Sequence, residues 1–247
     1  MERGGIIRDM EEKKVQHIHA FAIDNALVKP VDPIFIGYCI SQNADCGNKV
    51  VWKVHPDEKV GVMSQNSQGK PCIVEYSDVS PALRNAISEE TGKLKLGAGN
   101  ICNHYYTLSF LQTHVLPYMN GSDCDVYHLA KKNIPIMGGT DVVPGFKLES
   151  FIFHVFPLSQ RMALLDVPRE SEFAPVKNAP GATTDCPDTA RLAISNLSKQ
   201  WLKNAGAKLL LNKDNESAIC EVSPLTSYNG ENLSSYQGNL ISCPFTI

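Results

Sequence analysis

The segment VQHIHAFAIDNAL, residues 15–27, constrains the fold of this chain more than any other segment. Apolar and small residues follow one another almost without interruption, a pattern typical of a strand covered on both faces, as in α/β proteins. The segment ends in Asp24-Asn25, and ligands collect at strand ends in open α/β sheets. Asp24 is therefore a candidate ligand-binding carboxylate, although Asp-Asn is also common in turns.

Helix and strand patterns alternate along the rest of the chain. Strands are predicted over residues 48–54, 69–80 and 162–167, and helices over 5–14, 32–44 and from Ser80, with Pro81 as the first helical residue. Residues 95–119 are predicted to be a strand or turn that leads into a helix. The apolar residues Leu148, Phe151, Ile152 and Val155 recur at helical spacing and predict an amphipathic helix over 145–159.

A longer helix is expected after residue 185, capped by Asp185 or Asp188 and ended by Gly206 at C′. Its expected apolar stripe consists of Ala190, Ile194, Leu197 and Trp201. From Ala207 onward the sequence contains short strand and turn patterns. We therefore expect a mixed α/β fold in two parts, a core over residues 1–205 and a β-rich region over 206–247.

Charge and composition exclude several classes of protein. The 247 residues carry 23 basic and 26 acidic side chains, a net charge of −3, and no basic tract of the kind that binds nucleic acid. No apolar run is long enough to span a membrane, and the charged N-terminus does not resemble a signal peptide. The eight cysteines form no C-x-x-C pair, so we expect reduced thiols in a cytoplasmic protein and no zinc site.

The common catalytic motifs are missing. The sequence contains neither a P-loop nor a G-x-G-x-x-G element, and it has no G-x-S-x-G nucleophile elbow. MGGT, residues 137–140, is interpreted as a turn. His17, His19 and His104 are interpreted as packed or edge histidines, because the pattern offers no third metal ligand.

One lysine, Lys177, lies between Pro175 and Pro180 in the stretch EFAPVKNAPGATTDCPDTAR, residues 172–191. Proline restricts the backbone, so this loop is expected to be stiff. A stiff loop suits a cation that must meet an anion, although most lysines are solvated surface charges.

Asp24, Glu75, Asn100, Lys147 and Lys177 remain as candidate functional residues. Two ammonium groups, an aspartate and polar groups for hydroxyls are consistent with a phosphate and sugar site.

The amino-acid sequences of six segments, and their order along the chain, resemble those of the eukaryotic UDP-N-acetylhexosamine (UDP-N-acetylglucosamine) pyrophosphorylases. They are the segment 18–51, VEYSDVS, GAGNICNHYYTLSFL, GFKLESFIFHVF, residues 172–191 and EVSPLTSYNGENL. The resemblance implies a GT-A-like, Rossmann-related nucleotidyltransferase core with a small β-rich C-terminal region. It implies that UTP and N-acetylglucosamine 1-phosphate react, with Mg²⁺, to give UDP-N-acetylglucosamine and pyrophosphate. Such a reaction needs positioning and charge neutralisation rather than a protein nucleophile.

The resemblance also implies roles for single residues. Lys177 and Lys147 match lysines at the phosphates, and Asp24 matches an aspartate near the metal. The residues that match the sugar-binding side are Gly61, Glu75 and Asn100, with Phe151 and Phe153 as aromatic walls of the N-acetyl pocket. Core packing remains an alternative for Phe151.

Two departures from the family pattern affect what the chain is expected to do. His154 stands where the family usually has aspartate, which reverses the charge preference if that carboxylate supports the site or the metal. The Gly-rich nucleotide loop of the family is not in this sequence, so we expect the chain to be the C-terminal half of such an enzyme, with doubtful activity and poor solubility alone. A pyrophosphorylase for another UDP-sugar and a non-catalytic homologue that binds nucleotide sugar remain alternatives.

Overall fold

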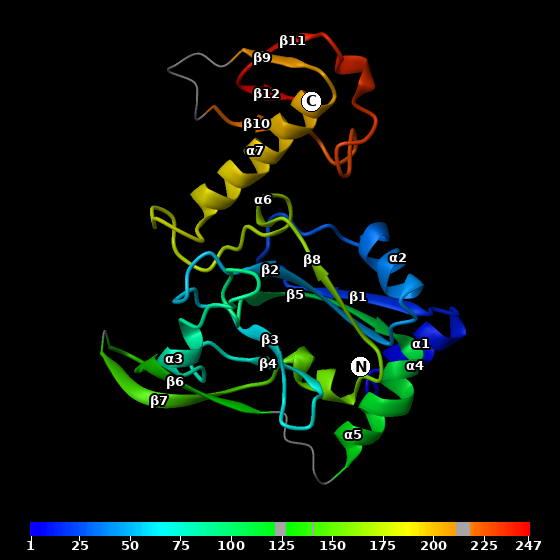
Figure 1. The fold of residues 1–247 in the computed structure, drawn as a ribbon, viewed down its shortest axis with the longest axis vertical. Coiled ribbons are helices and arrows are strands. Elements are labelled where there is room, and N and C mark those ends of the chain that lie inside the picture. The colour runs from blue at the N-terminus through cyan, green and yellow to red at the C-terminus, as the bar shows by residue number, and fades with distance from the viewer. Residues whose placement is uncertain (122–126, 140, 211–217) are drawn as a thin grey trace. The chain divides into compact units, whose positions relative to one another are not determined.

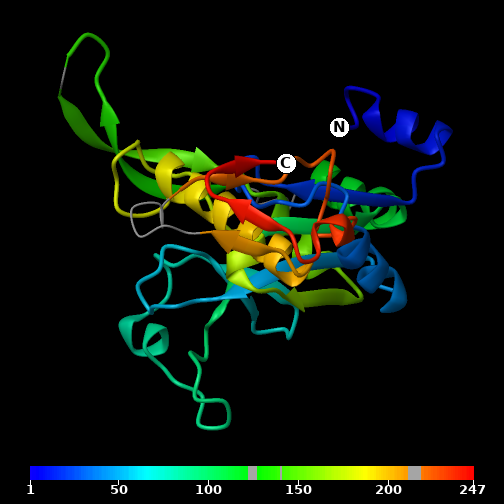
Figure 2. The same cartoon turned by 90° about the horizontal axis from the view of Figure 1, so that it is seen from above.

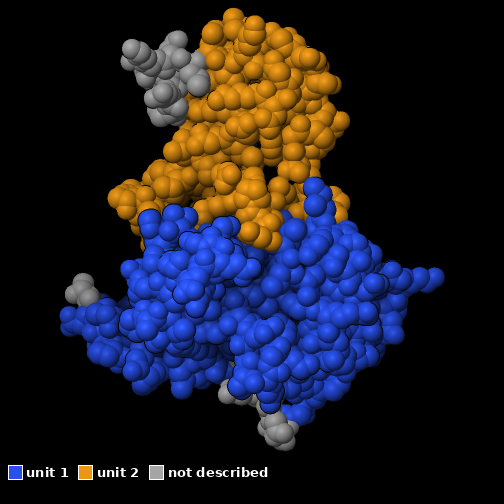
Figure 3. Space-filling model, viewed as in Figure 1, with its two compact units in different colours: residues 1–20, 34–100, 104–165 blue, residues 21–33, 101–103, 166–247 orange. Residues whose placement is uncertain are grey.

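A computed structural model describes residues 1–121, 127–139, 141–210 and 218–247. The chain divides into two compact units (Figure 3). The first contains residues 1–20, 34–100 and 104–165, and the second contains residues 21–33, 101–103 and 166–247. The long C-terminal helix therefore groups with the β-rich region, whereas the sequence suggested a boundary near residue 205.

Among the described residues, six strands form one sheet in the order β4-β3-β5-β2-β8, with β1 also paired to β5 (Figure 1). Their bounds are β1 His17–Phe21, β2 Cys46–Trp52, β3 Val62–Gln65, β4 Pro71–Val74, β5 Ala98–Thr107 and β8 Met162–Asp166. The pairs β2–β5, β3–β4 and β3–β5 are antiparallel. The mixed α/β fold class is confirmed, and the predicted strand regions lie in this sheet.

The strands with mostly buried residues include β2 and β5, whereas β1 is less buried. No residue of β1 is fully buried, so the prediction that residues 15–27 are covered on both faces is wrong, and the strand stops at Phe21. In β2 every residue except Trp52 is buried, including Asn48 and Lys49. Oδ1 of Asn48 bonds to a histidine of β5, and the Lys49 ammonium lies 5.4 Å from the centre of the Phe35 ring.

Short helices connect the strands. In the first unit they are α1 Ile6–Glu12, α2 Pro33–Ser41, α3 Pro81–Arg84, α4 Leu108–Phe110, the π-helix η1 Leu111–Val115, α5 Leu116–Asn120 and the 3₁₀ helix η2 Ile152–Leu158. Ser80 caps α3 as predicted, its hydroxyl accepting a hydrogen bond from the Leu83 N–H, but the helix is a single turn. The side chains of α2 pack against Tyr105 of β5 and Ala163 of β8 in the core of this unit.

The prediction of an amphipathic helix over 145–159 is wrong. Residues Val142–Glu149 form strand β7, which pairs antiparallel with β6, His128–Pro135, and the 3₁₀ helix η2 follows. The apolar spacing in this segment covers only two turns, which is too short to separate a helix from a strand. Pairing with β6 decided the outcome. The hairpin stands out from the rest of its unit (Figures 1 and 2).

The second unit is organised by α7, Pro187–Asn204, and short strands. Its other elements are α6 Arg169–Glu172, β9 Lys208–Leu210, β10 Cys220–Glu221, the 3₁₀ helix η4 Ser234–Tyr236, β11 Leu240–Ser242 and β12 Phe245–Thr246. β9 pairs parallel with β11, and β10 pairs parallel with β12.

The C-terminal end of α7 is as predicted. Gly206 has φ +88°, its N–H bonds to the carbonyl of Lys203, and the Ala207 N–H bonds to the carbonyl of Leu202. This is a Schellman arrangement, which requires a left-handed residue at C′.

The N-terminus and buried face of α7 differ from the prediction. The N-cap residue is Cys186, because the Asp185 carbonyl closes the preceding loop and the Asp188 carboxylate accepts from the Gly181 N–H. The buried residues of α7 are Ala190, Ser195, Ser198, Lys199 and Leu202. Of the predicted apolar stripe only Ala190 is buried, whereas Ile194, Leu197 and Trp201 are not. The hydroxyls of Ser195 and Ser198 accept hydrogen bonds from the backbone N–H groups of Cys220 and Val222, which satisfies polar groups on the buried face.

Candidate functional site

Three of the predicted sugar-binding residues meet in the first unit. The backbone N–H of Asn100, on β5, donates to the carbonyl of Gly61 over 2.8 Å. A Cβ atom added to Gly61 would lie 3.0 Å from Oε1 of Glu75, which directly follows β4. The carboxylate therefore lies over the bare backbone of Gly61, and a side chain at this position would displace it. The predicted grouping of these residues is present in the fold.

The two predicted aromatic walls stack on one another. The rings of Phe151 and Phe153 lie 4.8 Å apart with an interplanar angle of 10°. Phe153 is buried and lies in η2, which packs against β4, the strand that leads into Glu75. The aromatic pair and the carboxylate are thus held by neighbouring elements of one unit.

His154 lies beside the aromatic pair. Its ring meets the rings of Phe151 and Phe153 nearly at right angles, at centroid distances of 5.4 and 5.8 Å. Its Nδ1 is buried and has no hydrogen-bond partner in the part of the chain that the structure describes. His154, where the sequence analysis expects a departure from the family pattern, therefore lies against the two predicted aromatic walls.

The sequence interpretation missed a polar pair behind this aromatic cluster. His104, fully buried on β5, has Nδ1 at 2.9 Å from Oδ1 of Asn48, its partner on β2. The His104 ring also lies 6.2 Å from that of Phe153, in an edge-to-face arrangement. Burial lowers the pKa of His104 to about 3, so the ring is neutral. His104 is a packing residue, as predicted, but one that supports the candidate pocket.

Lys147 lies on strand β7 rather than at the start of a helix. Its ammonium is 3.2 Å from Oε1 of Glu149, two residues along the same strand, and its side chain is 64% exposed. An exposed pair of this kind is weak, so the lysine can exchange Glu149 for another anion.

Asp24 and Lys177 are brought together in the second unit. Residues 24–26 pair antiparallel with residues 174–176, through an isolated bridge between Asn25 and Pro175. The Val176 N–H donates to the Asp24 carbonyl over 2.9 Å, so Lys177 directly follows the residue bonded to Asp24. The predicted carboxylate and the predicted cation therefore occupy adjoining segments.

The loop that carries Lys177 is closed at its base. The backbone N–H groups of Lys177 and Asn178 both donate to the carbonyl of Asp185, over 2.7 and 2.8 Å. The Asn178 side chain donates to the carbonyl of Thr184. Lys177 is exposed. These bonds hold the backbone of the loop and leave the Lys177 side chain on the surface of its unit, where it can reach an anion.

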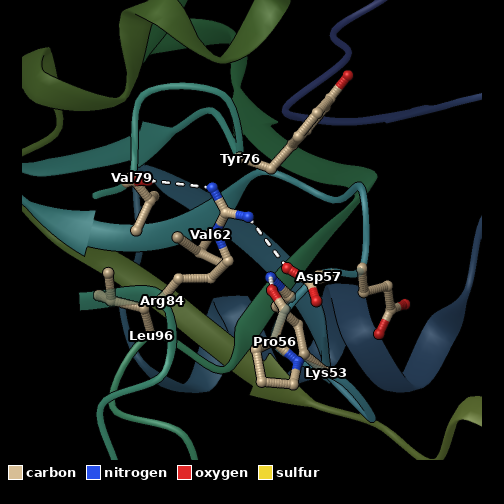
Figure 4. A pocket seen from close by; sticks show the side chains of 9 residues that line it. Lys53, Pro56, Asp57, Val62, Tyr76, Val79, Arg84 and Leu96 are labelled. Atoms are coloured by element: carbon tan, nitrogen blue, oxygen red, sulfur yellow. Dashed lines mark hydrogen bonds and ion pairs between the residues drawn. The ribbon is translucent and has the colours of Figure 1, made fainter. Parts of the chain in front are cut away.

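A small cavity lies beside β3 in the first unit (Figure 4). Its volume is about 20 Å³, close to that of one water molecule. Its cations already have partners, because Arg84 donates to Asp57 and to the Val79 carbonyl, and Lys53 donates to the Pro56 carbonyl. In Figure 4 the ring of Tyr76 points away from Arg84. The cavity suits an ordered water near the buried Arg84 Nε, which has no hydrogen-bond partner among the described residues.

The structure adds three findings on other classes of site. Within the described ranges, no cluster of three or more His, Cys, Asp or Glu residues could hold a metal ion. None of the described helices combines the length and apolar character needed to cross a bilayer. Cys39, Cys46, Cys72, Cys186 and Cys220 are thiols, and Cys124 lies outside the described residues.

Comparisons with known proteins find relatives of this chain. A human protein, UDP-N-acetylhexosamine pyrophosphorylase-like protein 1, is 40% identical over all of this chain and 52% of its own length. UDP-N-acetylglucosamine diphosphorylase 2 of Arabidopsis thaliana is 42% identical over 92% of this chain and 45% of its own length. The chain thus spans about half the length of the curated relatives it matches.

Solved structures share the fold. The uridine diphosphate N-acetylglucosamine pyrophosphorylase of Trypanosoma brucei, crystallised with an inhibitor, superposes with a TM-score of 0.75 at 28% identity, over 96% of this chain and 50% of that chain. The sequence profile of the UTP–glucose-1-phosphate uridylyltransferase family matches residues 1–237. The chain therefore belongs to the UTP–glucose-1-phosphate uridylyltransferase family.

Proposed function

We propose that this chain takes part in the transfer of a uridylyl group from UTP to N-acetylglucosamine 1-phosphate, giving UDP-N-acetylglucosamine and pyrophosphate. The observation that carries the proposal is the pairing of residues 24–26 with 174–176, which puts a carboxylate and a loop lysine on adjoining segments. Relatives named for this activity are about 40% identical to the chain.

The reaction proceeds by attack of a sugar phosphate oxygen on the α-phosphorus of UTP, from which pyrophosphate leaves. Its transition state carries negative charge on the phosphoryl oxygens, so a fixed cation lowers the barrier. In the proposal, Lys177 supplies that cation from its closed loop, and Lys147 contacts the phosphates after exchanging its pair with Glu149. No protein nucleophile is needed.

The sugar is held by the first unit. Glu75 accepts a hydrogen bond from a sugar hydroxyl above the bare backbone of Gly61, and Asn100 lines the same position. The stacked rings of Phe151 and Phe153 pack against the acetamido methyl group. His154 stands at the edge of that wall.

Mg²⁺ is the cofactor in this proposal, and Asp24 is its protein ligand. Magnesium in phosphoryl-transfer sites takes one or two carboxylates and fills its remaining positions with substrate phosphates and water, so a single aspartate fits. When bound, the ion neutralises phosphate charge. We also propose a cytoplasmic location, which the thiol state of the described cysteines supports.

A panel of sugar 1-phosphates tests the proposal. Pyrophosphate release from UTP is measured with N-acetylglucosamine, N-acetylgalactosamine, glucose and galactose 1-phosphates, on the longest natural form of the protein. Preference for the N-acetylated sugars supports the proposal.

A second candidate function is a pyrophosphorylase for UDP-glucose, which the description of the matching family favours. Preference for glucose 1-phosphate in the same panel establishes it. Binding of UDP-N-acetylglucosamine without any pyrophosphate release contradicts both functions and indicates a non-catalytic homologue.

A further inference from the structure

The side chain of Asn25 joins the two segments that carry Asp24 and Lys177. Asn25 is buried, with 2% of its surface exposed. Its Nδ2 donates to the carbonyl of Glu172 over 2.7 Å. Its Oδ1 accepts from the N–H of Ala174 over 2.9 Å and from the N–H of Leu27 over 3.2 Å. One carboxamide therefore uses three of its four hydrogen-bonding positions to hold these segments.

These bonds fix the register of the pairing. The Ala26 N–H donates to the Ala174 carbonyl over 3.0 Å, and the Val176 N–H donates to the Asp24 carbonyl over 2.9 Å. Pro175, opposite Asn25, has no N–H to contribute. The Asn25 carboxamide supplies the additional bonds at this point, one residue from Asp24 and close to Lys177 in the paired segment.

We propose that Asn25 is a positioning residue that sets the register between the Asp24 carboxylate and the Lys177 ammonium. The inference rests on the proposed function, in which these two groups contact the metal and the phosphates. Asn25 itself touches neither substrate nor metal. Its carboxamide acts by keeping the two segments from sliding or parting, so that both groups face the same ligand.

A separate ion pair holds the same segments when Asn25 is changed. The Lys29 ammonium lies 2.7 Å from Oε1 of Glu172, and the two side chains are only 12% and 8% exposed. Removal of the carboxamide should therefore loosen the register without separating the segments, which makes a folded variant attainable.

Protection of Lys177 against acetylation tests the inference. The protein is treated with acetic anhydride at increasing concentrations of UDP-N-acetylglucosamine with Mg²⁺, and acetylation of Lys177 is read by mass spectrometry. A partly unfolded variant would also show a higher half-protection concentration, so only variants shown by thermal unfolding to be folded at the assay temperature are compared. Asn25→Ala removes all three bonds of the carboxamide, and we expect the half-protection concentration to rise about tenfold as the register loosens. We also expect kcat of pyrophosphate release to fall further than KM rises.

Two more variants sharpen the test. Asn25→Ser keeps a small uncharged side chain whose hydroxyl can still accept from the Leu27 N–H, and it loses the donor to Glu172, so we expect a smaller rise in half-protection concentration, about threefold. It decides the question if Asn25→Ala fails to fold. The matched control is Asn239→Ala, which removes a single exposed bond from an asparagine side chain to the Ser235 carbonyl and should leave protection unchanged.

The outcomes separate the two hypotheses. If Lys177 is protected in the unaltered protein and the half-protection concentration is unchanged in Asn25→Ala, the positioning role is overturned and the proposed function stands. The same result in Asn25→Ser decides the question if the alanine variant is unfolded. Absence of protection in the unaltered protein overturns the phosphate role of Lys177 and this inference with it.

Discussion

Replacement of Gly61 by alanine tests the sugar-side geometry directly. A Cβ atom there would lie 2.8 Å from Cγ2 of Ile73, 3.0 Å from Oε1 of Glu75 and 3.5 Å from Cδ of Glu75. Carbon atoms pack at about 3.5 Å or more, so the Ile73 methyl must retreat by about 0.7 Å. The Glu75 carboxylate must move by a few tenths of an ångström, away from the position at which it would meet a sugar hydroxyl.

The expected cost falls more on binding than on stability. Overpacking costs about 1–3 kcal/mol, and the low end applies here because both obstructing groups are ends of side chains. A hydrogen bond to a charged acceptor contributes about 1.5–3 kcal/mol. Its loss raises the dissociation constant about 10-fold to 100-fold, since 1.4 kcal/mol corresponds to a factor of ten.

Calorimetric titration with UDP-N-acetylglucosamine measures the effect, and thermal unfolding measures stability. The control is Gly37→Ala on α2, where an added Cβ meets nothing within 4 Å. That variant should bind as the unaltered protein does and gain up to about 1 kcal/mol from helix propensity. If Gly61→Ala binds the nucleotide sugar as tightly as Gly37→Ala does, Glu75 does not face the sugar across Gly61 and the reasoning fails.

Three further predictions concern charge. Lys177→Ala should lower turnover tenfold or more, because it removes a cation that stabilises the transition state. The control is Lys203→Ala, exposed on α7, which should not change turnover. Equal turnover in the two variants would mean that Lys177 is an ordinary surface charge. The pKa of His104 is lowered by burial from 6.5 to about 3, so stability should fall by up to about 1.4 kcal/mol per pH unit as pH drops through this range. The free energy of unfolding in urea, measured at pH 7 and pH 4.5, should fall less with pH in His104→Gln than in the unaltered protein. An equal fall in both proteins would contradict this prediction. Hydrogen bonds from backbone N–H groups, that of Tyr228 first, lower the pKa of Glu231 below 4.5. The ionised carboxylate therefore stabilises the folded protein above pH 4.5, and this stabilisation is lost as the pH falls through the lowered pKa. The thermal midpoint should consequently drop less between neutral and acidic pH in Glu231→Gln than in the unaltered protein.

Local features of the fold were predictable where a short stretch of sequence decides the structure. Gly206 ends α7 because only a left-handed residue completes the Schellman arrangement, and Ser80 caps the turn that begins at Pro81. The Lys177 loop is likewise held by bonds within residues 177–185.

The hairpin β6–β7 shows where such local rules stop. Apolar spacing over 145–159 favoured a helix, but pairing with a second strand determined the structure. A hydrogen-bonding partner outside the segment is not visible in its own periodicity.

The sequence by itself determined the family, the mixed α/β fold class and the residue types of the candidate site, because those are carried by contiguous segments. Tertiary structure alone decided that β2 is buried despite its asparagine and lysine, since burial of such side chains is favoured by partners that distant segments supply, as His104 does for Asn48 Oδ1. The same holds for Asn25, whose carboxamide bonds to residues nearly 150 positions away. Hydrogen bonds between remote segments set both the core and the register of the site, and their geometry exists only in the folded chain.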